Sequence, residues 1–469
     1  MGVGVWLNGG MSKSFRAWDV DQPLLLPPSV QELVPAGHLA HFIRDTVRET
    51  LDLSAILSEY TEERGYPPYH PVMMVALLRY AYCQGVYSSR RIARACEERV
   101  DFMAVTARQT PDFRTISDFR KRHLKALGGL FGQVLQLCAE AGLVKLGHVA
   151  LDGTKMWANA SKHKAMSYGR MRKAEPELAA QVAKWFAEAA AADAAEDDAL
   201  GADVRGDELP EWVANKQQRL ARIRAAMAAL EAEAAAAAEE LGASEEGAEG
   251  PPRESGGPAG RAEEGASQEQ PSPPPRPPKE KAQRNFTDPD SRIMKTADGF
   301  EQAYNAQAAV DAASQVIVAE QLTNATNDKQ QLVPMVEGIA QQTGRVPREL
   351  SADSGYCSED NLQELEQRHI RGYVATGRQR HGEASATGHR ATRAGTRVEA
   401  MKTRLKRGGH RSRYRLRKQT AEPVFGQIKA ARGFRQFHLR GLEKVREEWR
   451  LICTAHNLLK WAVACGVGA

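Results

Sequence analysis

Cysteine is scarce in this 469-residue sequence, and its placement excludes two kinds of site. The six cysteines form no C-x-x-C pair and no dense framework, so we expect neither a cysteine-rich zinc site nor a disulfide-stapled secreted scaffold. We interpret them as buried thiols in a reducing cytoplasm. They are Cys83, Cys96, Cys138, Cys357, Cys453 and Cys465.

The sequence also lacks a long hydrophobic run. No N-terminal stretch has the basic, apolar and small-residue order of a signal peptide. The apolar segment at residues 451–469 is interrupted by His456, Asn457 and Lys460, and is therefore too polar for a membrane-spanning helix. We predict a cytoplasmic protein that has no membrane partner.

The chain is longer than one hydrophobic core usually organises, and 42% of its residues are hydrophobic. Several regions are therefore expected. We predict a disordered extension at residues 1–14, an all-helical domain at 15–143 and a larger domain at 144–469. An insertion at 165–285 interrupts the larger domain.

Charge is strongly segregated along the chain, although the formal net charge is only +5. Residues 371–450 hold 22 Lys and Arg against 6 Asp and Glu, whereas residues 174–270 hold 8 against 22. A net charge of +16 within eighty residues favours contact with a polyanion such as nucleic acid over a merely solvated surface.

Within the predicted domain at 15–143, residues 38–140 have helical periodicity. One short helix carries Arg90, Arg91 and Arg94, which is typical of a helix-turn-helix DNA reader. Many helical hairpins have the same pattern without touching DNA, so both interpretations stay open. A further basic helix is expected to begin at a Thr115 cap.

The insertion is rich in Ala and Glu. Helical spacing from 173 to 242 predicts two helices with a break near 201–210. Residues 251–278 contain nine prolines and are expected to form a flexible linker. The acidic character of the insertion argues against DNA contact. We prefer a tolerated, solvated insertion over one that mediates protein association or shields the basic region in the absence of DNA.

The remaining sequence alternates between short β-prone runs and helical segments. This alternation predicts an α/β domain that is built around a mixed sheet. The second and third runs are expected to form a hairpin. The runs lie at 148–152, 303–310, 315–322, 349–353 and 372–376.

Two of the predicted strands end in an acid, Asp152 and Asp353. Ligand and metal sites form at the carboxyl ends of strands in open α/β sheets. A third acid, Glu422, is expected to open a helix, with Lys429 seven residues later on the same face. Three converging carboxylates repel one another unless a cation neutralises them, and Mg²⁺ is commonly held by a few carboxylates together with phosphate oxygens.

Each acid also has a plainer interpretation. Asp152 can begin an Asp-Gly turn, Asp353 can cap the following helix, and Glu422 can pair with Lys418 across one helical turn. The combination of strand, strand and helix positions with the basic region favours a metal site.

Several other polar residues are candidates for the site. Asp288 and Asp290 occur in TDPDSR, which we interpret as a turn. Lys155 and Asn159 follow closely on the first acid and are in reach of a phosphate. His456 has no partner at ligand spacing, so we expect a buried, hydrogen-bonded histidine.

In its motifs the chain resembles the DDE transposases of bacterial insertion sequences, most closely the insertion sequence 1182 group. The resemblance rests on the blocks VALDGTKMWANAS, TDPDSRIMKTADGFEQAYNAQAAVD and ADSGYCSEDN, and on the final helix through HNLLKW. It implies an RNase H-like fold. It also implies that Asp152, Asp353 and Glu422 form a triad that binds two Mg²⁺ or Mn²⁺ ions.

In related enzymes the third acid belongs to a Tyr, Arg, Glu, Lys signature. Tyr414, Arg417, Glu422 and Lys429 can fill it, but Arg417 lies five residues before the glutamate, whereas Lys418 has the common spacing of four. The basic residues are suited to grip phosphates, and the tyrosine can stack on or bond to the strand. Ordinary solvated helix charge is the alternative.

The resemblance implies a DNA transposase that binds the inverted ends of its mobile element, cleaves a phosphodiester with metal-activated water and joins the 3′-hydroxyl to target DNA. It implies a homo-oligomer, most simply a dimer on paired ends, in the bacterial nucleoid. The alternative is a non-catalytic or domesticated DNA-binding protein. A haloacid-dehalogenase phosphatase is excluded, because Ala150 replaces the nucleophilic aspartate of D-x-D-G-T.

Overall fold

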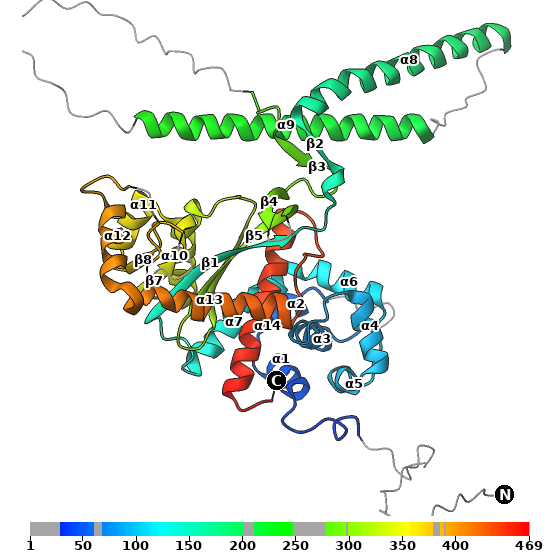
Figure 1. The fold of residues 1–469 in the computed structure, drawn as a ribbon. Coiled ribbons are helices and arrows are strands. Elements are labelled where there is room, and N and C mark those ends of the chain that lie inside the picture. Colours follow the sequence, from blue (N-terminus) through cyan, green and yellow to red (C-terminus); the bar gives the residue numbers. More distant parts are fainter. Residues whose placement is uncertain are drawn as a thin grey trace, which may run out of the picture.

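The computed structural model describes residues 29–60, 68–200, 211–246, 277–296, 299–378, 385–388 and 391–468. The extension predicted at 1–14 and most of the proline-rich segment predicted at 251–278 lie outside these residues. In the described part, a mixed sheet and its helices stand beside a group of N-terminal helices, and a two-helix arm projects from them (Figure 1). None of the described helices combines the length and apolar composition needed to cross a membrane.

The N-terminal region is helical throughout its described residues from Leu39 to Glu140. In α1, Leu39, Ile43 and Val47 recur every four residues and are buried, which gives the helix one apolar face. The helices are α1 (Leu39–Glu49), α2 (Ser54–Leu57), α3 (Pro71–Cys83), α4 (Ser89–Glu98), α5 (Val100–Thr106), α6 (Phe113–Arg122) and α7 (Leu124–Glu140).

The cap predicted for α6 was wrong. Asp112, not Thr115, caps this helix, and its Oδ1 accepts hydrogen bonds from the backbone N–H groups of Arg114 at 2.7 Å and Thr115 at 3.2 Å. A carboxylate at the N-cap satisfies unpaired N–H groups and favours the positive end of the helix dipole. The helix therefore begins at Phe113, before the predicted cap.

The sheet has the strand order β4-β5-β1-β7-β8, and β6 also pairs with β5. β1 lies antiparallel to β5 and parallel to β7, and β7 lies parallel to β8. The predicted α/β class with a mixed sheet is confirmed, and so is the β5–β6 hairpin. The strands are β1 (His148–Trp157), β4 (Arg292–Thr296), β5 (Gly299–Asp311), β6 (Ile317–Thr323), β7 (Glu349–Ala352) and β8 (Arg371–Val374).

One hydrophobic core connects the sheet with the N-terminal helices. Buried residues of both parts, such as Ile43, Phe131 and Leu151, belong to the same cluster. The last helix, α14 (Leu442–Ala464), packs against α3, α7 and β6. The regions predicted as two domains therefore share a core.

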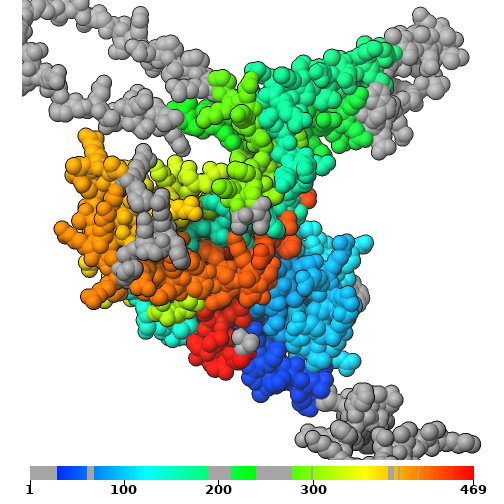
Figure 2. Space-filling model, viewed as in Figure 1, coloured from blue at the N-terminus to red at the C-terminus, as the bar shows by residue number. Residues whose placement is uncertain are grey.

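The arm consists of α8 (Tyr168–Leu200) and α9 (Glu211–Glu246). The first helix ends and the second begins on either side of residues 201–210, where the sequence predicted a break. It stands clear of the sheet and of the N-terminal helices (Figure 2). At its base, β2 (Ala165–Ser167) pairs with β3 (Gln283–Asn285), and a small apolar cluster that includes Ile223 holds the helices together. In the sequence, the arm is therefore an insertion between the sheet strands β1 and β4.

The C-terminal half adds four helices around the described strands: α10 (Leu332–Thr343), α11 (Glu359–Gln367), α12 (Arg397–Gly408) and α13 (Leu416–Gly426). The sequence did not predict α12, because this basic segment buries only Met401 and Leu405. The short turns η4 (Gly409–Arg411) and η5 (Arg413–Arg415) connect it to α13, and the π-helical turn η6 (Gln427–Ala431) follows α13.

His456 on α14 is buried and hydrogen-bonded, as predicted. Its Nε2 lies 2.8 Å from the carbonyl oxygen of Gln315, and its Nδ1 lies 3.1 Å from Nη2 of Arg432. Burial lowers the pKa of His456 to about 3, and the positive charges of Arg432 and Lys460 act in the same direction.

We expect His456→Gln to reduce the fall in the free energy of unfolding that occurs as the pH drops below 6.5. Below its ordinary pKa of 6.5 the unfolded chain binds a proton at His456, whereas the folded chain does not until about pH 3. The free energy of unfolding therefore falls as the pH drops through this window, by up to about 1.4 kcal/mol per pH unit. Urea unfolding between pH 4 and 7 measures the slope, with the exposed His163→Gln as control. Equal slopes in both variants would contradict the assignment.

Candidate active site

Asp152 lies in the middle of β1, not at the strand end as predicted. The strand continues because its pairing with β5 runs on to Trp157 opposite Ala303. Its parallel pairing with β7 stops at Ala150, so Asp152 lies just past the point where these two strands separate. The Asp152 side chain is only 9% exposed, and its Oδ1 accepts the backbone N–H of Gly153 at 3.0 Å.

Asp353 directly follows the last residue of β7, as predicted for a strand-end acid. Its Oδ1 accepts the backbone N–H of Gly355 at 2.8 Å and so caps the short turn η3 (Ser354–Tyr356). The next helix, α11, has its own cap in Ser358. Asp353 therefore does not cap that helix, and its side chain remains 36% exposed.

Glu422 lies inside α13 and does not open it, because the helix already begins at Leu416. This helix packs across β1 and β5, and this packing carries Glu422 towards the two aspartates. The Glu422 side chain is half exposed.

Arg417 brings the three acids together. Its Nη2 lies 2.9 Å from Oδ1 of Asp152 and 3.9 Å from Oδ2 of Asp353. Its Nη1 lies 3.3 Å from Oε1 of Glu422. The three carboxylates, which are far apart in the sequence, thus surround one guanidinium group. Lys418 is exposed, and Glu422 pairs with Arg417 instead of with Lys418.

The two aspartates are unfavourable places for negative charge. Burial raises the pKa of Asp152 to about 6, and repulsion by Asp353 adds to this effect, although Arg417 opposes it. Burial also raises the pKa of Asp353. The cluster therefore favours a group of positive charge among its carboxylates.

Tyr414 and Lys429 border the same cluster. Tyr414 in η5 is 8% exposed, and burial raises its pKa, with Arg417 opposing and the charge of Asp353 adding to the increase. Lys429 in η6 donates to Oγ1 of Thr154 and to the carbonyl oxygen of Lys155, at 2.5 and 2.9 Å. It is thereby fixed on β1 close to Asp152.

Asp328 is a neighbouring acid that the sequence analysis missed. It precedes η2 (Lys329–Gln331). Its Oδ1 accepts hydrogen bonds from Nδ2 of Asn305 at 2.6 Å and from Nε2 of Gln307 at 2.8 Å, and it lies 3.5 Å from Nζ of Lys155. Asn305 and Gln307 on the buried strand β5 were the available sequence signal for such an acid, because buried amide side chains need polar partners.

Gly355 separates Asp328 from Asp353. A Cβ atom added there would lie 3.0 Å from Oδ1 of Asp353 and 3.1 Å from Oδ2 of Asp328. Burial is the main cause that raises the pKa of Asp353, and the positive charge of Arg417 opposes it. The negative charge of Asp328 raises this pKa further. A side chain at this position would therefore press against both carboxylates, and glycine lets them pack closely.

Asp288 and Asp290 form a turn, as we interpreted them. Oδ1 of Asp288 accepts the Tyr304 hydroxyl at 2.8 Å and the backbone N–H of Gly441 at 3.1 Å. Oδ2 of Asp290 accepts the backbone N–H of Leu442 at 2.9 Å. Both carboxylates therefore hold the start of α14.

The other two residues that we expected within reach of phosphate have protein partners. Lys155 faces Asp328. Asn159 donates to the carbonyl oxygen of His438 at 2.7 Å, and its own carbonyl oxygen accepts the Nε–H of Arg440 at 2.9 Å. Asn159 thus stabilises the loop before α14.

The arginines predicted to read DNA lie on the solvent face of α4, and Arg90, Arg91 and Arg94 are all exposed. The Arg90 guanidinium lies over the ring of Phe113 at 4.9 Å. Arg94 pairs with Glu98 at 2.7 Å, whereas Arg91 forms no ion pair with a described residue. The structure does not bring this face together with the acids.

The three acids supply only oxygen donors, the type that hard divalent cations prefer. No group of three or more His, Cys, Asp or Glu side chains in the described part of the chain is arranged, as it stands, to hold a metal ion. The guanidinium group of Arg417 lies among the carboxylates. The donor set is chemically suited to a hard divalent cation, because all three acids present carboxylate oxygens to this guanidinium and burial disfavours the negative charge of Asp152 and Asp353.

Two parts of the chain match known protein families. Residues 28–122 match the family described as "Transposase domain (DUF772)", and residues 273–458 match the family described as "Transposase DDE domain". Asp353 and Glu422 lie within the second match, and Asp152 lies between the two. Neither a curated protein nor a solved structure matches the chain. The second family implies an RNase H-like fold, in agreement with the mixed sheet.

Proposed function

Because this chain belongs to the DDE-type insertion-sequence transposases, we propose that it cuts and joins DNA at the cluster of Asp152, Asp353 and Glu422. It binds the inverted ends of its own mobile element and hydrolyses a phosphodiester, which leaves a 3′-hydroxyl. That hydroxyl then attacks a phosphodiester of target DNA at the same cluster. The observation that carries the proposal is the contact of all three carboxylates with Arg417.

Transposases of this kind generally use divalent metal ions. In our proposal the three acids hold two Mg²⁺ or Mn²⁺ ions. When bound, such ions activate the attacking oxygen and stabilise the leaving oxygen of an in-line displacement. Burial of Asp152 suits this role, because a buried carboxylate gains more from a cation than an exposed one does.

Arg417 has to leave the carboxylates when cations bind there. Its side chain is then free to grip a phosphate of the bound strand, for which the planar guanidinium group is suited. We assign Lys429, fixed on β1 beside Asp152, to a second phosphate, and the exposed Lys418 to the strand further out. Tyr414, which is buried and lies within the electrostatic influence of Arg417 and Asp353, is assigned to contact the strand at the cut.

The exposed arginines of α4 are assigned to recognition of the element ends. Arg91 and Arg94 can reach phosphates or bases from the solvent face of the helix, as in helix-turn-helix proteins. Arg90 lies against Phe113 and contributes positive charge at the edge of this face. We further propose that two copies of the chain bridge paired ends in the bacterial nucleoid and that the chain belongs to the insertion sequence 1182 group.

A cleavage assay tests the proposed function. The substrate is labelled duplex DNA that flanks the gene, incubated with the full chain and either Mg²⁺, Mn²⁺ or a chelator. We expect nicks that carry a 3′-hydroxyl, only with the divalent ions. Stable binding without nicks under every condition would instead support the non-catalytic DNA-binding alternative.

A further inference from the structure

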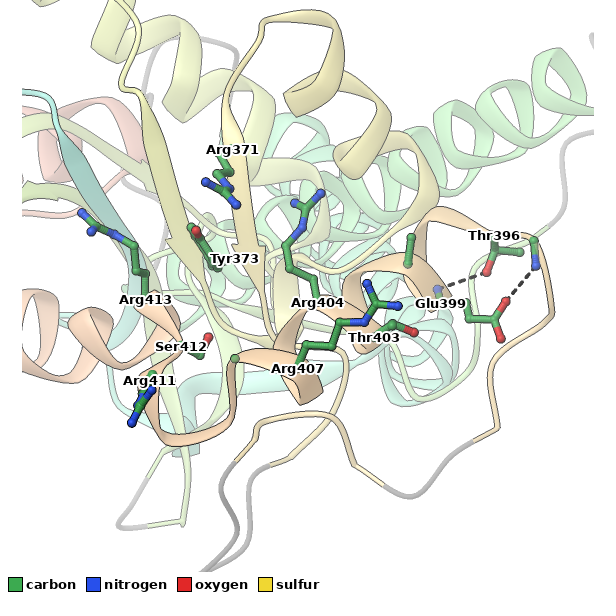
Figure 3. A pocket seen from close by; sticks show the side chains of 13 residues that line it. Arg371, Tyr373, Thr396, Glu399, Thr403, Arg404, Arg407, Arg411, Ser412 and Arg413 are labelled. Atoms are coloured by element: carbon green, nitrogen blue, oxygen red, sulfur yellow. Dashed lines mark hydrogen bonds between the residues drawn. The ribbon is translucent and has the colours of Figure 1, made fainter.

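A basic pocket lies beside the acid cluster, at the edge strand of the sheet. It is a hollow of about 840 Å³ between β8, α12 and the η4–η5 segment. Five arginines from these elements surround Tyr373 (Figure 3). We call this hollow the arginine pocket, and its arginines are Arg371, Arg404, Arg407, Arg411 and Arg413.

Most of this positive charge is not neutralised by the protein. Of the five arginines, only Arg413 forms an ion pair with a described residue, at 2.5 Å from Oε2 of Glu349. The one acid in the lining, Glu399, accepts the backbone N–H of Gly395 at 2.8 Å. Exposed like charges that are gathered around a hollow repel one another, so the pocket favours an anionic ligand.

The chemistry of the lining indicates phosphate groups. Arginine presents a planar fork of donors that matches phosphate oxygens, and several such forks favour a ligand with several phosphates. Tyr373 supplies an aromatic surface among them, as in grooves that track a nucleic-acid strand. Apolar small molecules are disfavoured, because their sites are lined mainly by hydrophobic side chains.

The chain connects the pocket directly to the acid cluster. Arg413, in the pocket, is followed by Tyr414 and, within the next turn, by Arg417, which contacts all three acids. In the sheet, β8 with Arg371 and Tyr373 lies beside β7, which is followed directly by Asp353. Arg371 lies opposite Glu349 at the start of β7, and Arg413 pairs with this glutamate, whereas the acid cluster lies past the end of the strand. A DNA strand with its scissile bond at the acids would therefore reach the pocket by running back along β7 and across η5.

We propose that the arginine pocket binds the phosphodiester backbone of DNA that extends past the cleavage point. This inference rests on the proposed function and adds a second contact region to it. The pocket anchors the DNA on one side of the cut, while the acids act on the scissile bond.

The test is DNA affinity of the full chain as a function of salt. Arg407→Gln combined with Arg411→Gln removes two pocket charges whose side chains have no described hydrogen bond or ion pair. Arg219→Gln combined with Arg222→Gln removes two exposed arginines from the arm as a matched control. The probe is duplex DNA that flanks the gene, in the absence of divalent cations.

We expect the pocket variant to bind roughly 60-fold more weakly at about 0.1 M salt, because each lost phosphate contact costs about eightfold there. The slope of log affinity against log salt should become less steep by about 2. The arm variant should stay within about threefold of wild type. Arg407→Lys combined with Arg411→Lys, which keeps the charges, should restore most of the slope and shows that the loss is not one of folding.

Two results would overturn the inference. One is equal affinity and slope in the pocket and arm variants when wild type binds DNA. The other is a loss of affinity in the pocket variant that stays the same both when the DNA on one side of the cleavage point is removed and when the DNA on the other side is removed, since one of these two changes takes away the strand that the pocket is proposed to hold. If wild type itself failed to bind this DNA, the result would count against the proposed function as well as the inference. Failure of the inference alone is distinguishable, because wild type then binds the DNA and only the effect of the pocket variant is missing.

Discussion

Asp152→Asn is expected to lower the rate of DNA cleavage by roughly 1,000-fold or more while DNA affinity stays within about threefold of wild type. Its carboxylate is the most buried of the three acids, with 9% exposure, and it lies on the rigid strand β1. Removal of a group that acts only in the reaction lowers the rate without weakening binding of the substrate. Single-turnover nicking and a binding titration of the same DNA measure the two effects.

The matched control for this variant is Asp360→Asn, which neutralises an exposed acid of α11 and should cut at the wild-type rate. Asn is close to Asp in size, and the raised pKa of Asp152 shows that its charge is unfavourable in the fold. The Asp152→Asn protein should therefore melt no lower than wild type at pH 8. Retention of full cleavage activity by this variant would remove Asp152 from the active site.

Arg417→Gln is expected to lower the free energy of unfolding at pH 8 by about 3 kcal/mol, the usual cost of removing one partner from a buried ion pair. Without Arg417, the pKa of Asp152 rises further above its ordinary value, because Arg417 is the main group that lowers it. The folded chain then binds a proton where the unfolded chain does not. The difference between variant and wild type should therefore be small near pH 4 and grow as the pH rises through 6.

Urea unfolding at pH 4.5 and pH 8 measures this effect, and Lys418→Gln on the same helix is the control, since Lys418 is exposed. Millimolar Mg²⁺ or Mn²⁺ at pH 8 should restore part of the stability lost in Arg417→Gln, because a cation that binds only the folded chain stabilises it. An equal loss of stability at both pH values would show that Arg417 acts through packing and not through the charges of the acids.

The convergence of the acids could be anticipated because it depends on sheet topology. Asp152 and Asp353 each end a β-prone run. If these two runs form neighbouring parallel strands of a mixed sheet, their carboxyl ends lie on the same side of the sheet, and the two acids come close together. The position of Asp152 within its strand was not predictable, because the antiparallel partner β5 extends β1 beyond the parallel pairing.

Other features depend on contacts between distant segments, which no local pattern reveals. Arg417 and Lys418 are adjacent in the sequence, and only the packing of α13 on β1 and β5 turns Arg417 towards the acids. Asp328 lies in a loop and gains its neighbours from β5. The arginine pocket needs α12, whose helical periodicity is hidden because few of its residues are apolar.

Local sequence patterns also could not predict that the N-terminal helices and the sheet share one hydrophobic core. The sequence separates naturally into a helical part at 15–143 and an α/β part at 144–469. In the structure, however, α14 from the end of the chain packs between α3, α7 and the sheet. Buried Glu448 on α14 accepts the backbone N–H groups of His438 and Leu439, and this fixes the loop between η6 and α14.

Binding of Mn²⁺ to the full chain in complex with uncut DNA tests the central claim most directly, because that claim concerns one cation-binding cluster made by three acids. Titration followed by electron paramagnetic resonance should show two ions per wild-type chain. Asp152→Asn, Asp353→Asn and Glu422→Gln should each weaken this binding, whereas Asp360→Asn should not. Equal Mn²⁺ binding by wild type and all three acid variants would contradict the account.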